Sequence, residues 1–371
     1  MDKIKILIVI GSLDYSNGIT NYAINYYRKL DKNKFEIDFV VHDCIKNKFY
    51  DLIIENGGKV FLLDNIKFSK LPQIYKEVKK IMQNKKYDIV HCHLLNIAFL
   101  YFGLAKKYGI QSRIIHSHAT KYAEKKTRVF RNMILGKIGL KMSTSKFACS
   151  NLAGKFLYKS KKFVIINNAI NIDKFSFKES VRNKIRKNLK INNEIVIGHI
   201  GRFSEQKNHK FLVDLLYELN SKSSKYKLVL LGDGHLFNDI VEYSKNKGVY
   251  DDICFIGNVD NPSDYYNVFD LFALPSLFEG LPVVGIEAQA NGLPCIFSDT
   301  ITKELELNKN VYFFPISEVS KWQEQIENIN LIRCNQLSYK LVNDYDINIQ
   351  TEKLEKSYID SIKSYKNERK I

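Results

Sequence analysis

The stretch IVIGHIGRFSEQKNHKFLVDLLYELNSKSSKYKLVLL, residues 195–231, decides the fold. Its first six and last five residues are short, largely apolar runs bounded by polar sequence, which is typical of buried strands. Between these runs, leucines recur at the spacing of one helical face: Leu212, Leu215, Leu216 and Leu219. A strand, an amphipathic helix and a second strand in this order predict one unit of a parallel sheet wound with helices.

The same alternation runs through the chain on both sides of this unit. In the first half, strands are predicted at residues 4–10, 37–41, 60–63, 89–91, 113–117, 147–149 and 163–166. In the second half, they are predicted at residues 195–200, 227–231, 253–256, 271–274, 294–297 and 311–314. The sequence thus predicts an α/β protein with two Rossmann-like, doubly wound parallel sheets.

Asn- and Lys-rich sequence replaces the apolar periodicity between the two sheets, at residues 169–190. We therefore expect two domains, residues 1–170 and 171–349. The last helical pattern, within residues 350–371, has one apolar face: Leu354, Tyr358, Ile362 and Tyr365. This segment either packs on its own domain or crosses back to the first domain, and we expect the crossing.

The charge of the chain is unevenly distributed. Its 371 residues include 45% hydrophobic side chains, enough for a packed core in each domain, and carry a formal net charge of +17. Residues 1–190 carry a net charge of +24 and residues 191–371 a net charge of −7. A codon bias toward lysine would not spare one half of the chain. The first domain is therefore expected to face an anion: a membrane surface, nucleic acid or a phosphorylated substrate.

A basic segment at residues 121–146 concentrates this charge. Against a single Glu124 it holds Lys121, Lys125, Lys126, Arg128, Arg131, Lys137, Lys141 and Lys146. Four apolar residues fall on a helical face between them: Phe130, Met133, Ile134 and Ile138. The pattern fits a solvated amphipathic helix or docking on anionic lipid. Because no nucleic-acid-binding module accompanies the charge, we expect a membrane surface rather than nucleic acid.

The cysteines and the apolar runs bear on the compartment. The six cysteines are scattered without any CxxC-type pair, which is typical of free thiols in a reducing compartment. The apolar run at residues 4–10 lacks a signal-peptide cleavage site, and the longest apolar stretch, residues 97–105, is about half of a membrane span. We expect a cytoplasmic protein, peripheral on the inner face of the plasma membrane.

The loop after the strand at residues 195–200 has the composition of a phosphate site. Gly201 allows a sharp exit from the strand, and Arg202 and Lys207 flank the start of the next helix, where free N–H groups favour an anion. Ligands of open parallel sheets bind at such carboxyl ends of strands. A diphosphate suits this position, and a solvated basic loop is the alternative.

The segment PSLFEGLPVVGIEAQANGLP, residues 275–294, is the most specific motif. Pro282 fits the first turn of a helix and Gly292 fits just past its end. Glu279 then lies in the loop before the helix, and Glu287 lies inside the helix. The backbone N–H groups at the helix start belong to Gly280, Leu281 and Val283. Two carboxylates and a positive helix end are thereby placed along one nucleotide-sugar.

This segment and the loop at residues 201–207 resemble the retaining glycosyltransferases of the GT-B fold, family 4, whose E-x7-E motif they match as Glu279 and Glu287. The resemblance spans nearly the whole chain and extends to enzymes of capsular and exopolysaccharide assembly. It implies a nucleotide-sugar donor held by the second domain, a saccharide or lipid-linked acceptor held by the first, and a cleft that the two domains face.

The resemblance also implies roles for individual residues. Arg202 and Lys207 would hold the donor diphosphate, Glu279 would contact the donor sugar, and Glu287 would bind the ribose hydroxyls. Backbone at Gly232 and Gly257 would pass close to the base. Near the first strand, Ser16-Asn17-Gly18 matches the family's glycine-rich loop, with Gly18 against the donor and Asn17 in place of a usual first glycine.

Four histidines form two His-x-His pairs at predicted strand ends: His91, His93, His116 and His118. Two such pairs on neighbouring strands could ligate zinc. We expect the two histidines of each pair to point to opposite faces, so that one of each enters the cleft, and neither pair has a carboxylate beside it. We therefore expect no metal. The family resemblance places His118 near the reacting centre.

The expected reaction transfers a hexose or N-acetylhexosamine, from a UDP-sugar, to a lipid-linked saccharide. The resemblance implies retention of anomeric configuration and no cofactor, with cations stabilising the departing diphosphate. Two alternatives keep the fold: a nucleotide-sugar 2-epimerase, which needs no acceptor, and a non-catalytic nucleotide-sugar-binding protein.

Overall fold

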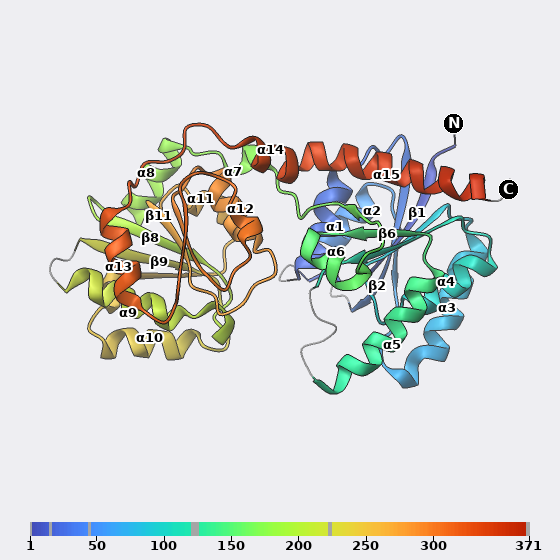
Figure 1. Ribbon diagram of the computed structural model, residues 1–371, viewed down its shortest axis with the longest axis horizontal. Helices are drawn as coiled ribbons and strands as arrows, with labels where there is room; N and C mark the ends of the chain where they lie inside the picture. The colour runs from blue at the N-terminus through green and yellow to red at the C-terminus, as the bar shows by residue number, and fades with distance from the viewer. Residues whose placement is uncertain (1, 15–16, 44–45, 120–125, 222–224, 369–371) are drawn as a thin grey trace. The chain divides into compact units, whose positions relative to one another are not determined.

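The computed structural model describes residues 2–14, 17–43, 46–119, 126–221 and 225–368, with backbone alone at 126–128 and 364–368. The chain divides into two compact units (Figure 1). Unit 1 comprises residues 1–169 and 347–371, and unit 2 comprises residues 170–346. Each unit is a parallel sheet covered by helices.

Unit 1 contains a seven-stranded sheet in the order β3-β2-β1-β4-β5-β6-β7. Its strands are β1 (Ile4–Ser12), β2 (Phe35–Asp43), β3 (Val60–Leu62), β4 (Ile89–Cys92), β5 (Ser112–Ser117), β6 (Ser145–Ala148) and β7 (Val164–Ile165). Its helices are α1 (Gly18–Lys29), α2 (Lys48–Glu55), η1 (Phe68–Lys70), α3 (Leu71–Asn84), α4 (Ala98–Lys107), α5 (Lys126–Met142), α6 (Asn151–Tyr158) and α15 (Ile347–Glu368).

The last helix of the chain, α15, completes unit 1. It contacts α1 and β5, and its Leu354 and Tyr358 are buried in the same apolar cluster as the core of β1 and β2. The hydroxyl of Ser112 in β5 also donates a hydrogen bond of 2.7 Å to the hydroxyl of Ser361 on α15. The predicted return of the C-terminal helix to the first domain is confirmed.

Unit 2 contains a six-stranded sheet in the order β10-β9-β8-β11-β12-β13. Its strands are β8 (Ile195–Ile200), β9 (Tyr226–Leu231), β10 (Ile253–Gly257), β11 (Leu271–Leu274), β12 (Cys295–Ser298) and β13 (Val311–Phe314). Its α-helices are α7 (Ile172–Phe175), α8 (Glu179–Asn188), α9 (His209–Asn220), α10 (Phe237–Asn246), α11 (Pro262–Tyr265), α12 (Val283–Ala290), α13 (Val319–Asn328) and α14 (Tyr339–Tyr345). The 3-10 turns are η2 (Glu205–Lys207), η3 (Tyr250–Asp252) and η4 (Lys303–Leu305).

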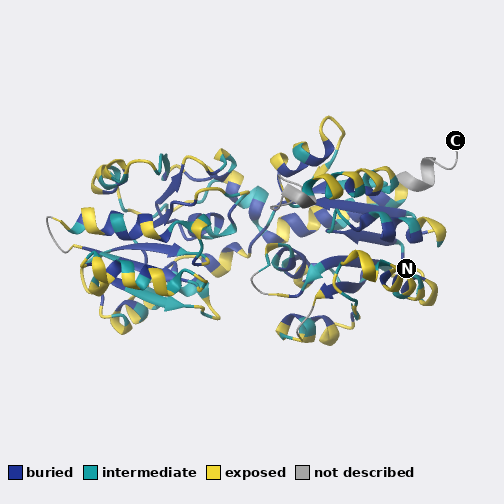
Figure 2. Ribbon diagram, turned by 90° about the horizontal axis from the view of Figure 1, so that it is seen from below, coloured by how far each residue is buried: buried dark blue, intermediate teal, exposed yellow. Residues whose placement is uncertain are grey.

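Burial explains why these residues form these elements. The central strands are buried on both faces, as a parallel sheet between two helix layers requires, whereas the helices expose one face (Figure 2). The four leucines of α9 are all buried, as their spacing predicted. The predicted α/β fold with two doubly wound parallel sheets is confirmed.

Two general features complete the description. The described cysteines, which exclude Cys44, are free thiols. Among the helices of the described residues, none combines the length and the apolar character that crossing a membrane requires.

Candidate active site

The loop between β8 and α9 brings Lys207 against the end of its own strand. A Cβ added to Gly201 would lie 3.1 Å from Cδ of Lys207 and 2.9 Å from Nε2 of the buried His199. Glycine at this position therefore makes room for the lysine side chain. Asn208, in the left-handed region at φ 55°, then turns the chain into α9.

Lys207 and Glu279 form an ion pair between two neighbouring strand ends. Nζ of Lys207 lies 2.6 Å from Oε1 of Glu279, and the two side chains are 16% and 11% exposed. Gln206 ties the two loops together, since its carbonyl accepts from Leu277 N at 2.8 Å and its amide donates to Phe278 O at 2.9 Å. Because β8 pairs directly with β11, residues 72 positions apart meet at one edge of the sheet.

Two further glycine turns lie at the ends of the next two strands. Gly232 follows β9 at φ +126°, and an added Cβ would lie 2.2 Å from the carbonyl oxygen of Gly201. Its N–H donates to the carbonyl of Gly257, which ends β10 at φ +73°. The loops after β8, β9 and β10 thus form one closely packed backbone surface at the carboxyl edge of the sheet.

The α12 helix begins beside Glu279. Pro282 is the N-cap residue at ψ 115°, so the helix starts at Val283 and the predicted place of Pro282 in the first helical turn is wrong by one residue. Its non-helical ψ keeps Pro282 outside the helix. An added Cβ at Gly280 would meet no atom within 4 Å, so the backbone here faces open space. Gly292 follows the helix at φ +79°, as predicted.

Glu287 lies one turn into α12 and already has a partner. Its Oε2 accepts a hydrogen bond of 2.7 Å from the hydroxyl of the buried Tyr266. Burial raises the pKa of Glu287, while the Tyr266 hydrogen bond and the charge of Lys174 oppose the rise. Tyr266 fixes the orientation of this carboxylate, and no pattern in the sequence indicated that tyrosine.

Arg202 is exposed. It follows Gly201 and precedes Phe203, which is fully buried and stacks on His209 with 3.9 Å between ring centroids. This anchor holds the loop backbone beside the exposed Arg202. The structure therefore joins Lys207 to Glu279, and it leaves Arg202 exposed on the loop that carries Lys207.

The four histidines of the two His-x-His pairs form a single cluster in unit 1, which corrects the expectation that each pair would split between two faces. The ring centroids of His91 and His93 are 4.3 Å apart, and those of His116 and His118 are also 4.3 Å apart. Residues i and i+2 of a strand share a face, which is the physical reason for the correction.

Hydrogen bonds link the rings of this cluster. Nε2 of His91 lies 3.0 Å from Nδ1 of His116, and Nδ1 of His93 lies 2.7 Å from Nε2 of His118. The hydroxyl of Tyr358 contacts Nδ1 of His91 at 2.8 Å. Burial lowers the pKa of His91 and of His118 to about 3, and burial together with the neighbouring histidines holds the pKa of His93 and His116 well below the usual value. The cluster is therefore uncharged at neutral pH.

Three of these histidines could hold a metal ion on distance alone. Ring nitrogens of His91, His93 and His116 lie within 4.8 Å of one another. Mutual hydrogen bonds already engage a nitrogen of each ring, and Nε2 of His116 is buried with no hydrogen-bond partner among the described residues. The hydrogen bonds explain most of the arrangement without an ion.

The start of α1 holds the predicted glycine-rich loop. Asn17 is the N-cap of α1, and its side-chain oxygen accepts from Ile19 N at 2.9 Å and from Thr20 N at 3.2 Å. Gly18, the first residue of α1, is exposed. Ser16 lies outside the described residues.

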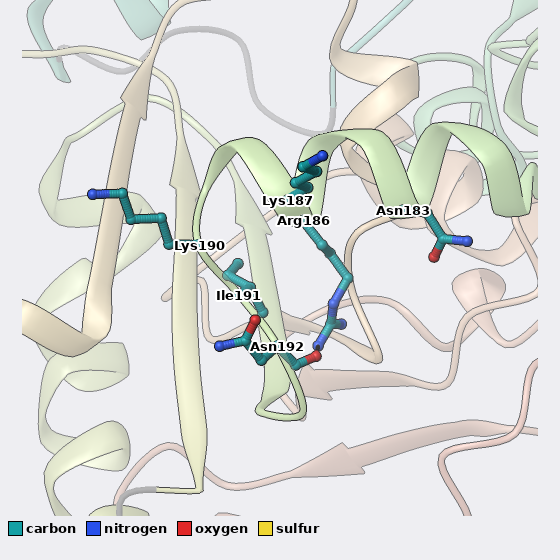
Figure 3. Close-up of a pocket in the computed structure, with 6 residues that line it drawn as sticks. All are labelled: Asn183, Arg186, Lys187, Lys190, Ile191 and Asn192. Carbon is teal, nitrogen blue, oxygen red and sulfur yellow. Dashed lines mark hydrogen bonds between the residues drawn. The ribbon is translucent and has the colours of Figure 1, made fainter.

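Unit 2 also has a hollow of about 380 Å³ that lies away from the Lys207–Glu279 pair (Figure 3). Arg186, Lys187 and Lys190 line it, but their side chains point in different directions. Arg186 binds Glu194 O at 2.6 Å and Asp270 at 3.1 Å, just before β8 and β11 begin. The hollow is therefore at the amino edge of the sheet, opposite the edge where ligands of such sheets bind.

Comparison with known proteins shows to which family this chain belongs. Residues 16–174 match the family model for glycosyltransferase family 4, and residues 181–344 match the model for glycosyl transferases group 1. EpsF of Bacillus subtilis, which is named as a glycosyltransferase, is 31% identical over 339 residues, covering 87% of this chain and 86% of EpsF. This chain belongs to the family 4 glycosyltransferases.

Two other comparisons describe what this glycosyltransferase is similar to. The Escherichia coli UDP-Gal:α-D-GlcNAc-diphosphoundecaprenol α-1,3-galactosyltransferase is 25% identical over 374 residues, covering 93% of this chain and 94% of that one. The crystal structure of Anabaena HepE with UDP and glucose superposes with a TM-score of 0.76 at 17% identity, covering 95% and 99% of the two chains. The GT-B fold of this glycosyltransferase is thereby established.

Sequence reasoning missed the tyrosines that support the candidate site residues of the glycosyltransferase. Tyr266 holds Glu287, Tyr358 contacts His91, and the ring of Tyr22 lies 4.9 Å from that of His118. Tyr358 was recognised as part of an apolar helical face, which does not reveal its hydroxyl contact. The other two follow from the tertiary fold alone.

Proposed function

We propose that this glycosyltransferase transfers a hexose or N-acetylhexosamine from a UDP-sugar to a lipid-linked saccharide in the assembly of a surface polysaccharide, with retention of anomeric configuration. The observation that carries the proposal is the Lys207–Glu279 pair at the carboxyl edge of the unit 2 sheet. A diphosphate needs a fixed cation, and a sugar hydroxyl needs a fixed carboxylate. The two side chains supply both within 2.6 Å.

The surrounding backbone supports a donor at this edge. Gly201, Gly232 and Gly257 let the loops after β8, β9 and β10 pack closely at this edge, and in our proposal the nucleotide lies along their backbone groups. The positive end of α12 adds attraction for phosphate. Glu287, oriented by Tyr266, is positioned to accept hydrogen bonds from ribose hydroxyls. Leu281 and Val283 contribute backbone N–H groups at the helix start.

Two neighbours motivate the choice of donor and acceptor. The E. coli relative uses UDP-Gal and a diphosphoundecaprenol-linked sugar by its name, and HepE was crystallised with UDP and glucose. We assign the same classes here: a UDP-sugar for unit 2 and a lipid-linked saccharide for unit 1.

In the proposed mechanism, the bond between the anomeric carbon and the diphosphate breaks through an oxocarbenium-like state, and the acceptor hydroxyl oxygen forms the new bond to that carbon on the same face. The departing diphosphate takes the hydroxyl proton. Arg202 and Lys207 stabilise the charge that grows on the departing diphosphate, each charge-assisted hydrogen bond contributing about 1.5–3 kcal/mol. His118, uncharged at neutral pH, acts as a hydrogen-bonding group toward the sugar rather than as an acid. With two cations at the diphosphate, no metal is required, and transfer should survive EDTA.

Transfer assays test the proposal directly. Purified protein is incubated with a panel of UDP-sugars and a diphosphoprenyl-linked saccharide, and the anomeric configuration of the product is read by NMR. Lys207→Ala and Glu279→Ala should each lower turnover about 100-fold or more. Lys210→Ala, an exposed lysine on α9, is the matched control. Turnover near wild type in either site variant, with the fold intact, would contradict the assigned roles. Sugar modification without acceptor would favour an epimerase.

A further inference from the structure

The outer helices of unit 1 carry an apolar groove that the transfer reaction does not explain. It has a volume of about 550 Å³ and lies between η1–α3 and α4. Phe68, Leu71 and Tyr75 line one side, and Phe99, Gly103 and Lys107 line the other. Phe68 is 81% exposed and Tyr75 is 44% exposed, although both are aromatic. Contiguous apolar surface of this kind marks an interaction site.

The neighbouring helix α5 adds further exposed apolar residues to the same layer of helices. Phe130, Ile134 and Ile138, spaced by four residues, are all exposed. The helix packs closely on α4 and on the turn before it, because an added Cβ at Gly139 would lie 3.0 Å from Ala98 and one at Gly136 would lie 2.9 Å from Leu95. Since α3 also packs on α4, the three helices form one layer (Figure 1).

The helices of this layer also carry many exposed positive charges. The exposed cations on or next to these four elements (η1, α3, α4 and α5) include Lys67, Lys70, Lys76, Lys106, Lys107, Arg131, Lys137 and Lys141. The sequence of these four elements contains a single acidic residue, Glu77, which pairs with Lys80 at 3.1 Å. Lys70 also has a partner, Asp64, at 3.5 Å. The exposed surface of these elements therefore combines apolar side chains with an excess of positive charge.

We propose that this face, defined by η1, α3, α4 and α5, docks on an anionic lipid bilayer, with Phe68 inserted and lipid chains entering the α3–α4 groove. Lysines pair with lipid headgroups while aromatic and aliphatic side chains reach the acyl region, which is the division of labour at a membrane interface. A second copy of the chain docked on this face would bring its lysines close to those of the first copy, and the like charges would repel each other. A nucleic acid would leave the exposed aliphatic residues without a partner.

The docking goes beyond the transfer reaction and does not depend on which sugar is moved. It explains the basic character of the first half of the chain through exposed, described side chains. Of the basic segment predicted from sequence, Lys121, Glu124 and Lys125 lie outside the described residues, and nothing in the docking face depends on them.

Co-sedimentation of the full chain with vesicles tests the inference. Vesicles of equal parts phosphatidylcholine and phosphatidylglycerol should bind the protein, and vesicles of phosphatidylcholine alone should not. Phe68→Ser should weaken binding about ten-fold. Lys67, Lys106 and Lys107 changed together to Gln should weaken it about 100-fold, at about five-fold for each charge.

Matched controls come from unit 2. Tyr339 is 83% exposed, so Tyr339→Ser removes an equally exposed aromatic residue. Changing the exposed Lys210, Lys225 and Lys309 to Gln removes the same charge. Both controls should bind vesicles as wild type does. Equal binding to neutral vesicles, or wild-type binding by Phe68→Ser, would overturn the proposal. A thermal shift with UDP, measured on every variant, reports the donor site separately.

Discussion

At the scale of single residues, the glycines at the carboxyl edge of unit 2 have the sharpest requirements. Gly232 combines φ +126° with a Cβ position 2.2 Å from a carbonyl oxygen of the next loop. Any other residue must strain its own backbone and push the Gly201 loop away. Because that loop carries Arg202 and Lys207, the strain would reach the side chains proposed to bind the donor.

Gly232→Ala is expected to lower the free energy of unfolding of unit 2 by about 2–5 kcal/mol and to weaken UDP binding. Thermal unfolding and calorimetric titration measure the two effects. Gly280→Ala is the control for stability, because its Cβ would enter open space. If Gly232→Ala were as stable as Gly280→Ala, the close packing of the two loops would be wrong.

The buried histidines give unit 1 a pH dependence whose sign is fixed. Burial lowers the pKa of His91 and His118 to about 3, below the unfolded value of about 6.5. Between these values the unfolded chain binds more protons, so the free energy of unfolding falls as pH falls from about 6.5 toward 3. Each histidine contributes up to about 1.4 kcal/mol per pH unit in that window.

Thermal melts between neutral pH and the acid side of this window should show the loss. His116→Gln removes one buried imidazole and should make the melting temperature less sensitive to acid. His235→Gln, at an exposed position, should keep the wild-type slope. Melting temperatures that do not change across the window would show that the cluster is not neutral in the folded state.

At the scale of elements, α15 is part of unit 1 although it ends the chain. Its Tyr358 is buried against His91 of β4 and Phe147 of β6, and its hydroxyl contacts Nδ1 of His91. Tyr358→Phe keeps the ring but leaves that nitrogen without a partner, which costs about 1–3 kcal/mol of unfolding free energy. Tyr339→Phe on the exposed face of α14 should change nothing measurable. Equal melting temperatures for both variants would contradict a structural role for the Tyr358 hydroxyl.

The elements themselves were largely readable from the sequence. Apolar runs such as residues 195–200 and 271–274 match β8 and β11, because strands buried on both faces have no alternation to obscure them. Pro282 was misplaced by one residue because helix caps depend on local dihedral angles. The prediction that the two histidines of each His-x-His pair point to opposite faces was wrong, because side chains two residues apart on a strand share a face. The spacing in the sequence was sufficient for the right prediction.

At the scale of the whole molecule, the two sheets and the return of the C-terminal helix to unit 1 could be predicted from the sequence. The candidate site could be predicted only in part. Lys207 and Glu279 could be named because each follows a strand, but their contact depends on β8 lying beside β11. That adjacency is a property of sheet order, to which residues far apart in sequence contribute. The support of Glu287 by Tyr266 and the α3–α4 groove depend on tertiary packing in the same way.

The central claim is that the loops after β8 and β11 hold the diphosphate of a nucleotide-sugar. Calorimetric titration of UDP into wild-type protein, Lys207→Ala and Lys210→Ala measures it most directly. We predict one UDP bound per wild-type chain, an affinity about 10- to 100-fold weaker for Lys207→Ala, and no change for Lys210→Ala. Wild-type affinity in Lys207→Ala would contradict the claim.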